Sequence, residues 1–314
     1  MTTRQIAAEN TGPVTIDATL LGHAGTITVR ADATCERATL TVHTADEEGE
    51  AADTVRRATL RQSGTGLYVS VEGKGGGTTI VTGGGGRNVV QSVISNNTGS
   101  VIQVGGNFFG GNVVGVSGGN VVSDVVINGV RFAGVGGTTV IKGTSPIEIT
   151  AVVPEGSSVI GRTQSADVIA EGALLNVSGT TQSGDVRTGH VAKVTASTQS
   201  GDVVVAQAAH IDAKTQSGDV RLGRTDVVEG STMSGDIRID DFGGTARLNT
   251  MSGAIRVHAT AGGDLSARTM SGDIHVTATE AALDDDLDVR ANSMSGNVTT
   301  PRRRSGGSEP RRRR

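Results

Sequence analysis

Cysteine and aromatic residues are scarce in this chain of 314 residues, which has one Cys, one Tyr, four Phe and no Trp. The single Cys35 cannot form a disulfide within the chain, and it fits a reducing compartment. The sequence has no run of eighteen apolar residues, and residues 1–12 lack the basic-then-apolar pattern of an export signal. We therefore expect a soluble, cytoplasmic protein that does not contact a membrane.

Motifs that bind metals or phosphates are also missing. The Gly run at 83–86 lacks the Lys-Ser/Thr ending of a phosphate-binding loop. The six histidines do not combine with Cys or acidic residues at the spacing of metal ligands. We expect no cofactor and no metal site. The histidines are His23, His43, His190, His210, His258 and His275.

What the chain does have is one six-residue phrase that returns eight times. Three copies read TQSGDV, and the others vary it as TQSADV, TMSGDI, TMSGAI and SMSGNV. The steps between successive starts are 18, 17, 17, 17, 18, 19 and 24 residues, and a short fixed period is typical of a stacked repeat architecture. The phrase starts at Thr163, Thr181, Thr198, Thr215, Thr232, Thr250, Thr269 and Ser293.

On both sides of each phrase, apolar and polar residues alternate with the period of two that is typical of a half-buried strand. Seventeen residues cannot bury an apolar face alone, but coils stacked about 4.8 Å apart share one continuous core. The predicted fold is all-β: a single-chain, right-handed β-solenoid of about eight coils of 17–19 residues, with an N-terminal β cap region. A chain of hairpins turning at Ser-Gly is the rival, although such turns favour Asn-Gly.

The Ser-Gly-Asp of each phrase should form the bend between two strands. We expect Gly there for its access to positive φ, and Asp for its bonds to neighbouring backbone amides. The same residues recur in coil after coil, which indicates a structural role. These repeat residues are Thr181, Ser183, Gly184, Asp185, Thr198, Gly201, Asp202, Thr215, Gly218, Asp219, Thr232, Gly235, Asp236, Thr269, Gly272 and Asp273.

The second position of the phrase changes from Gln in the first four coils to Met in the last four. One interpretation is a core that becomes drier toward the C-terminal end. The other is that the Met half is an interface, covered by another segment or another subunit. The Met column consists of Met233, Met251, Met270 and Met294.

Composition divides the chain into five parts. The net charge is −4, and the tail contributes +6 through seven Arg and one Glu, so the remaining residues carry −10. The predicted layout is a flexible leader (1–12), an N-terminal β region with one short helix at 46–58 (13–73), a Gly/Asn/Val-rich insertion (74–144), the solenoid repeats (145–299) and an Arg-rich disordered tail (300–314).

The insertion allows two interpretations. It could be a set of irregular coils or a hairpin laid against the rod, or a segment that pairs with copies of itself, because it combines high β propensity with low charge. The candidate self-assembly residues are Ile102, Gln103, Val104 and Gly105. They are similar to the core of the RIP homotypic interaction motif, and the longer VIQVGGNFFGG is similar to actinobacterial amyloid-signalling motifs.

The N-terminal strands, the PEGSS segment within 153–159 and the serial T-x-S-G-D-[VI] phrases together resemble a known family. This is the bacterial "putative adhesin" family of β-strand-repeat domains, also called toastrack domains. The resemblance covers 13–73 and 146–299; the 74–144 insertion departs from it. It implies a β-solenoid without known catalysis that serves in scaffolding or interaction.

The coils carry nearly the same residues, and this similarity bears on whether the protein is an enzyme. A catalytic carboxylate pair is a singular arrangement, whereas Asp recurs in nearly every phrase, so we expect no enzyme. The acidic residues Asp284, Asp285, Asp286 and Asp288 indicate a solvated turn rather than a cation site. The Arg-rich tail offers the sole route to nucleic acid, without aromatic residues for stacking.

The predicted function is a non-enzymatic scaffold or protein-interaction (adhesin-like) module that engages itself or another protein. Two alternatives stay open. One is an assembly-signalling protein that polymerises through 74–144, and the other is a glycan-binding or glycan-cleaving β-helix.

Overall fold

The computed structural model describes residues 1–73, 81–82, 125–127, 130–132, 139–140 and 145–301. In the 74–144 insertion the described residues are four short strands in two antiparallel pairs. β7 (Val81–Thr82) pairs with β10 (Thr139–Val140), and β8 (Val125–Ile127) pairs with β9 (Val130–Phe132).

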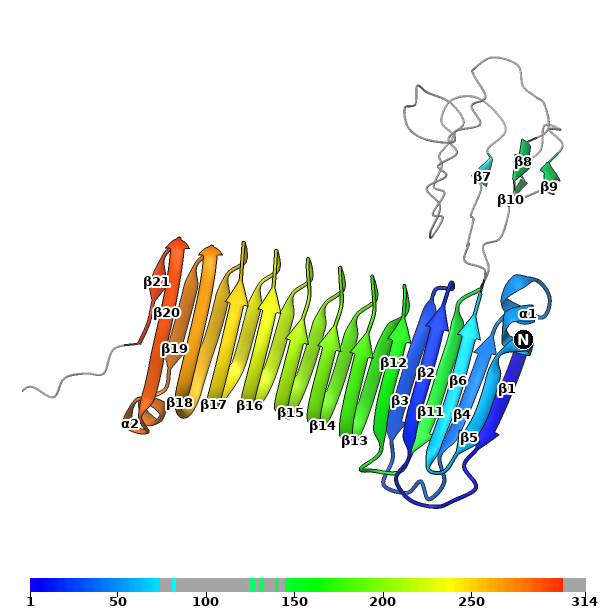
Figure 1. The fold of residues 1–314 in the computed structure, drawn as a ribbon, viewed down its shortest axis with the longest axis horizontal. Helices are drawn as coiled ribbons and strands as arrows, with labels where there is room; N and C mark the ends of the chain where they lie inside the picture. The colour runs from blue at the N-terminus through cyan, green and yellow to red at the C-terminus, as the bar shows by residue number, and fades with distance from the viewer. Residues whose placement is uncertain (74–80, 83–124, 128–129, 133–138, 141–144, 302–314) are drawn as a thin grey trace, which may run out of the picture.

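Six long strands form the regular part of the structure, and each pairs in parallel with the next along the rod (Figure 1). The register keeps equivalent residues side by side; Val203, for example, lies between Val186 and Val220. The predicted β-solenoid is confirmed. The strands are β13 (Asp167–Thr180), β14 (Val186–Ser197), β15 (Val203–Lys214), β16 (Val220–Thr232), β17 (Ile237–Thr250) and β18 (Ile255–Ser271).

Each long strand changes direction midway, so that its two halves belong to the two sides of the solenoid. The first half of β18 pairs with β19 (Ile274–Ala278), whereas its second half pairs with β20 (Leu287–Ser295). Buried and exposed residues alternate in both halves. A coil therefore has two corners: the phrase, and a second corner in the middle of the strand.

Strands from distant parts of the chain close the N-terminal end. From β13, one side continues through β12, β2 and β6 to the antiparallel β5, and the other through β3 and β11 to the antiparallel β4 and β1. Helix α1 covers this end (Figure 1). The elements are β1 (Thr2–Ala7), β2 (Thr15–Leu21), β3 (Gly25–Ala31), β4 (Thr39–Thr44), α1 (Glu50–Arg57), β5 (Thr59–Ser63), β6 (Gly66–Glu72), β11 (Ile147–Val153) and β12 (Ser158–Thr163).

Helix α1 falls within the range predicted for it, with Ala51, Ala52 and Val55 buried. The leader differs from our expectation. Residues 2–7 are not a loose segment but form β1, because the edge of β4 offers them an antiparallel partner and Ile6 packs against the core.

The C-terminal end consists of β19, a short helix α2 (Glu280–Asp284), β20 and β21 (Val298–Thr299), which pairs with β19. Thr279 caps α2 by accepting a hydrogen bond from the Ala282 backbone N–H at 3.2 Å. The turn after α2 places Asp286 at a φ of 50°. The longest interval between phrases, 24 residues, is thus taken up by α2 and this turn.

The core is a narrow file of Val, Ile, Leu and Ala between the two sides. Most of these side chains are fully buried, and Phe242 is the one aromatic among the largest buried side chains of the described residues. Phe242 lies at the middle corner of β17, where the register with β18 shifts. The repeated small apolar residues keep the coils narrow, as a solenoid of 17-residue turns requires.

Candidate functional site

The phrase corner is the most regular feature of the molecule, and its Thr lies in the core. The hydroxyl of Thr215 accepts a hydrogen bond from the Gly218 N–H at 3.0 Å and donates one to the Gly201 carbonyl of the preceding coil at 3.3 Å. The same pair of bonds is made by Thr198, Thr232 and Thr250, and the phrase threonines are only 3–6% exposed. Each hydroxyl therefore links two coils and satisfies a buried N–H.

The phrase glycines are needed for a reason that differs from the one we predicted. None of them has a positive φ. Instead, a Cβ built on Gly218 would lie 1.9 Å from the carbonyl oxygen of Gly201, and a Cβ on Gly235 would lie 1.8 Å from that of Gly218. The backbones of successive coils approach so closely at this corner that no side chain fits between them.

The phrase aspartates form a ladder along the rod. The Asp202 Oδ1 accepts a hydrogen bond from the backbone N–H of Asp219 at 2.9 Å, and the Asp219 Oδ1 accepts one from Asp236 at 2.9 Å. Arg221 lies between the outer oxygens of Asp202 and Asp219, 2.7 Å from each. These exposed ion pairs contribute little to stability, but they balance the like charges of the column.

The pKa of Asp236 bears on the catalytic alternative. Burial acts to raise it, but the N–H of Ala254 and the guanidinium of Arg256 outweigh that effect, so the pKa of Asp236 lies below the ordinary carboxyl value. A general acid needs the opposite shift. The shift at Asp236 is therefore not that of a general acid.

The Met column is exposed, which corrects the interpretation of a drier core. The exposed fractions are 49% for Met233, 45% for Met251, 51% for Met270 and 77% for Met294. The Gln residues at the same position of earlier coils are exposed or half-buried as well. The position follows the buried Thr, so its side chain points away from the core, and the last four coils present a file of thioethers to solvent.

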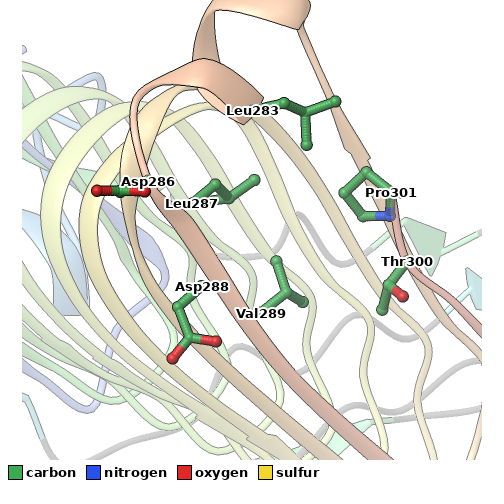
Figure 2. A pocket seen from close by; sticks show the side chains of 7 residues that line it. All are labelled: Leu283, Asp286, Leu287, Asp288, Val289, Thr300 and Pro301. Atoms are coloured by element: carbon green, nitrogen blue, oxygen red, sulfur yellow. The ribbon is translucent and has the colours of Figure 1, made fainter. Parts of the chain in front are cut away.

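Two shallow hollows lie elsewhere on the rod. One of about 420 Å³ opens at the C-terminal end, where Leu287 and Val289 lie across from Thr300 and Pro301 (Figure 2). Asp286 and Asp288 stand at its rim. The acidic residues predicted as a solvated turn thus lie beside apolar side chains of the last coil.

The second hollow, of about 510 Å³, follows the middle corners of β13 to β16. Its polar residues include His190, Gln207 and Arg224, which occupy equivalent positions in three successive coils. This alignment is not apparent from the histidines alone, because only one of the three residues is a His. The 17-residue step between these three positions is the signal that could have found it.

The remaining sequence predictions concern metal ligands, membrane spans and two segments that lie largely outside the described residues. In the described part of the chain, His, Cys, Asp and Glu do not gather in groups of three that could hold a metal ion. Neither α1 nor α2, the helices of the described residues, has the length or apolar composition to span a bilayer. The candidate self-assembly residues 102–105 and most of the Arg-rich tail lie outside the described residues.

Comparison with known proteins gives one family and several distant structures. A family model described as Toastrack DUF4097 matches residues 128–312. No curated protein matches the chain.

The solved structures that resemble it include a "putative lipid binding protein" from Parabacteroides distasonis, with a TM-score of 0.41, 12% identity and coverage of 95% of this chain and 97% of that one. Another is a "putative adhesin" from Parabacteroides merdae, with a TM-score of 0.40, 11% identity and coverage of 95% and 96%. A third is a "putative adhesin" from Bacteroides fragilis, with a TM-score of 0.39, 13% identity and coverage of 95% and 97%.

Proposed function

Because the chain belongs to the Toastrack DUF4097 family, we propose that it is a non-enzymatic β-solenoid that acts as a protein-interaction scaffold through its exposed Met column. The observation that carries the proposal is the exposure of four methionines on successive coils, 45–77% for each side chain. A single exposed apolar residue is ordinary, whereas an aligned file of them presents a continuous apolar strip.

The chemistry of the phrase supports a role without catalysis. Its Thr hydroxyls and Asp carboxylates are engaged in bonds between coils, and the same bonds recur in most coils. A reaction needs one coil that differs from its neighbours in geometry and protonation. Here the coils differ at two positions of the phrase: Gln changes to Met, which alters the surface, and Ala254 and Asn297 replace Asp, which alters a bond between coils.

The geometry of the Met column suits an extended partner. Equivalent residues of neighbouring coils are about 4.8 Å apart, so four methionines span about 15 Å. Flexible, polarisable thioethers adapt to partners of varied shape, which is why methionine is common at promiscuous binding surfaces. We expect the partner to be a protein that places an apolar strip along this edge.

The test replaces the four methionines by Gln, the residue that the first four coils carry at the same position. This change should leave the fold intact, which circular dichroism and thermal unfolding would check. The wild-type chain and the Gln variant are then used as paired baits in native lysate, and bound proteins are identified by mass spectrometry. A partner that wild type retains and the Gln variant loses supports the proposal.

A matched control extends the strip instead of removing it. Gln182, Gln199 and Gln216 changed to Met should retain the same partner more strongly. Equal retention by wild type and the Gln variant would defeat the proposal for this surface. Light scattering of both forms distinguishes self-association from the capture of another protein.

A further inference from the structure

The two ends of the rod are closed to different degrees. At the N-terminal end, Leu40 and Val42 of β4 are 0% exposed, because β1 and α1 lie beyond β4 and cover it. At the C-terminal end, Val298 of β21 is 42% exposed, although its equivalent one coil earlier, Ile274, is 1% exposed. The apolar interior of the last coil is therefore open along the axis of the rod.

Strand β20 is also more exposed than the equivalent strand of the preceding coil. Val289 pairs with Leu265, which is 1% exposed, yet Val289 itself is only partly buried and lines the hollow at this end (Figure 2). Leu287 and Ala291 share its inward face and are also only partly buried. Their outer sides lack the apolar neighbour that each inner coil receives from the next.

The outer edge of β20 is suited to further pairing. Among the described residues, β20 pairs in register with β18 on one side and has no strand on the other. It is nine residues long and contains no proline or bulge, and the charges that it carries, on Asp288 and Arg290, have opposite signs. A strand added here would continue the sheet.

The charges of β20 indicate which strand fits. Its outward face carries Asp288 and Arg290 around the inward Val289. When two copies of β20 pair antiparallel, residues directly opposite each other must share a face, so the twofold axis passes through a residue. An axis at Val289 places Asp288 opposite Arg290 twice, whereas an axis at either neighbour places like charges opposite each other.

We propose that the C-terminal end is a dimer interface, in which residues 287–291 of β20 in two copies pair antiparallel about Val289 and join two solenoids end to end. Leu287 of each copy then lies opposite Ala291 of the other, and the apolar interior continues across the junction. The two Asp288–Arg290 contacts fix the register more than they add affinity. Of the Met column, Met294 alone lies in β20, and the proposed contacts at residues 287–291 do not include it.

The test uses exposed charges, so the variants should fold. The full-length chain is measured by light scattering and sedimentation over a range of concentrations, and the expected mass is twice the 31.7 kDa of one chain. Asp288→Arg or Arg290→Asp alone places two like pairs across the junction and should weaken dimerisation about tenfold or more. The double variant D288R/R290D restores both unlike pairs and should dimerise like wild type.

Mixing the two single variants, Asp288→Arg and Arg290→Asp, gives the most specific test of the register. The two single variants should form a heterodimer with each other more readily than either forms a homodimer, because every opposed pair in the heterodimer is unlike. A wild-type chain that is monomeric at the highest concentration reached would overturn the proposal. Dimers that respond equally to the single and the double variants would overturn it too.

A third measurement distinguishes dimerisation through β20 from self-association through the Met column. The variant M233Q/M251Q/M270Q should remain dimeric, whether or not it loses a partner protein. If that variant becomes monomeric while the charge variants do not, self-association occurs through the Met column, and the end-to-end dimer is refuted.

Discussion

Replacing Gly218 by Ala tests how closely the coils stack at the phrase corner. The added Cβ would lie 1.9 Å from the Gly201 carbonyl oxygen, whereas ordinary contacts begin at 3.4 Å, so one coil must shift by about 1.5 Å. Both groups are fixed to the backbone, and no change of rotamer can relieve the overlap.

The cost can be worked out from the bonds that cross this corner. The Ser217 N–H donates to the Gln199 carbonyl at 2.9 Å, and the Asp219 N–H to the Asp202 Oδ1 at 2.9 Å. The Thr215 hydroxyl adds a third bond, to Gly201. A shift of about 1.5 Å breaks all three, and at about 1 kcal/mol each the free energy of unfolding falls by about 3 kcal/mol.

Two measurements check this prediction. Urea unfolding gives the change in free energy, and hydrogen exchange shows whether protection is lost at the Ser217 and Asp219 amides in particular. The local readout matters because stability in a repeat rod is a sum of neighbouring contacts, and distant coils can stay folded. Loss of protection confined to the two coils that meet at Gly218 is the expected pattern.

The chain offers a matched control in its first phrase, which has Ala166 at the position of Gly218. There the preceding segment is the β2–β3 connection, and the Thr163 hydroxyl donates to the Ala166 carbonyl instead of accepting from its N–H. Ala166→Gly should therefore cost only about 0.5–1 kcal/mol, from backbone entropy. If G218A cost no more than A166G and left amide protection unchanged, the close-stacking argument would be refuted.

Substitutions at three further positions test the other phrase residues. Thr215→Val leaves the buried Gly218 N–H without its acceptor and should lower the free energy of unfolding by about 1–3 kcal/mol. Thr215→Ser keeps the hydroxyl and should lower it by about 1 kcal/mol. Equal losses in urea unfolding would contradict a stabilising role for the hydroxyl. Ala254→Asn supplies the Asp273 N–H with the side-chain oxygen that Ala254 lacks and should raise the free energy of unfolding by about 0.5–1 kcal/mol, which a lower thermal midpoint would contradict. The depressed pKa of Asp236 means that the folded state binds fewer protons than the unfolded state, so this contribution to stability is present above pH ~3.9 and is lost as the pH falls through the folded pKa. Asp236→Asn should flatten the acid limb of stability against pH, and an unchanged slope would exclude this source.

Periodicity alone was enough to predict the solenoid. The 17-residue step places Val186, Val203 and Val220 in one column, and the structure pairs them in that register. The role of Asp also followed from repetition, since a residue found in nearly every coil must serve the coil. What repetition could not reveal is the distance between backbones, so the reason for Gly at the corner required coordinates.

The exposure of the Met column could have been predicted from the sequence. Period-two alternation continues into the phrase: the Thr points inward, and the residue after it points outward. The hydrophobic character of Met suggested the core, but its position in the strand decides its direction. The four Gln residues at the same position of the earlier coils were the signal, because a buried column would not carry four unpaired amides.

The ends of the rod were the least predictable parts because they do not repeat. At the N-terminal end, β4 pairs with β11 across more than a hundred residues of sequence, and no period relates the two. At the C-terminal end, β20 keeps the inward face of a coil and lacks the coil that would cover it. A repeat extends itself with the same bonds at each step, so what stops it, or joins it to another copy, must come from residues outside the repeat. For this chain both proposals therefore rest on what differs between coils: the uncovered strand β20 and the second position of the phrase.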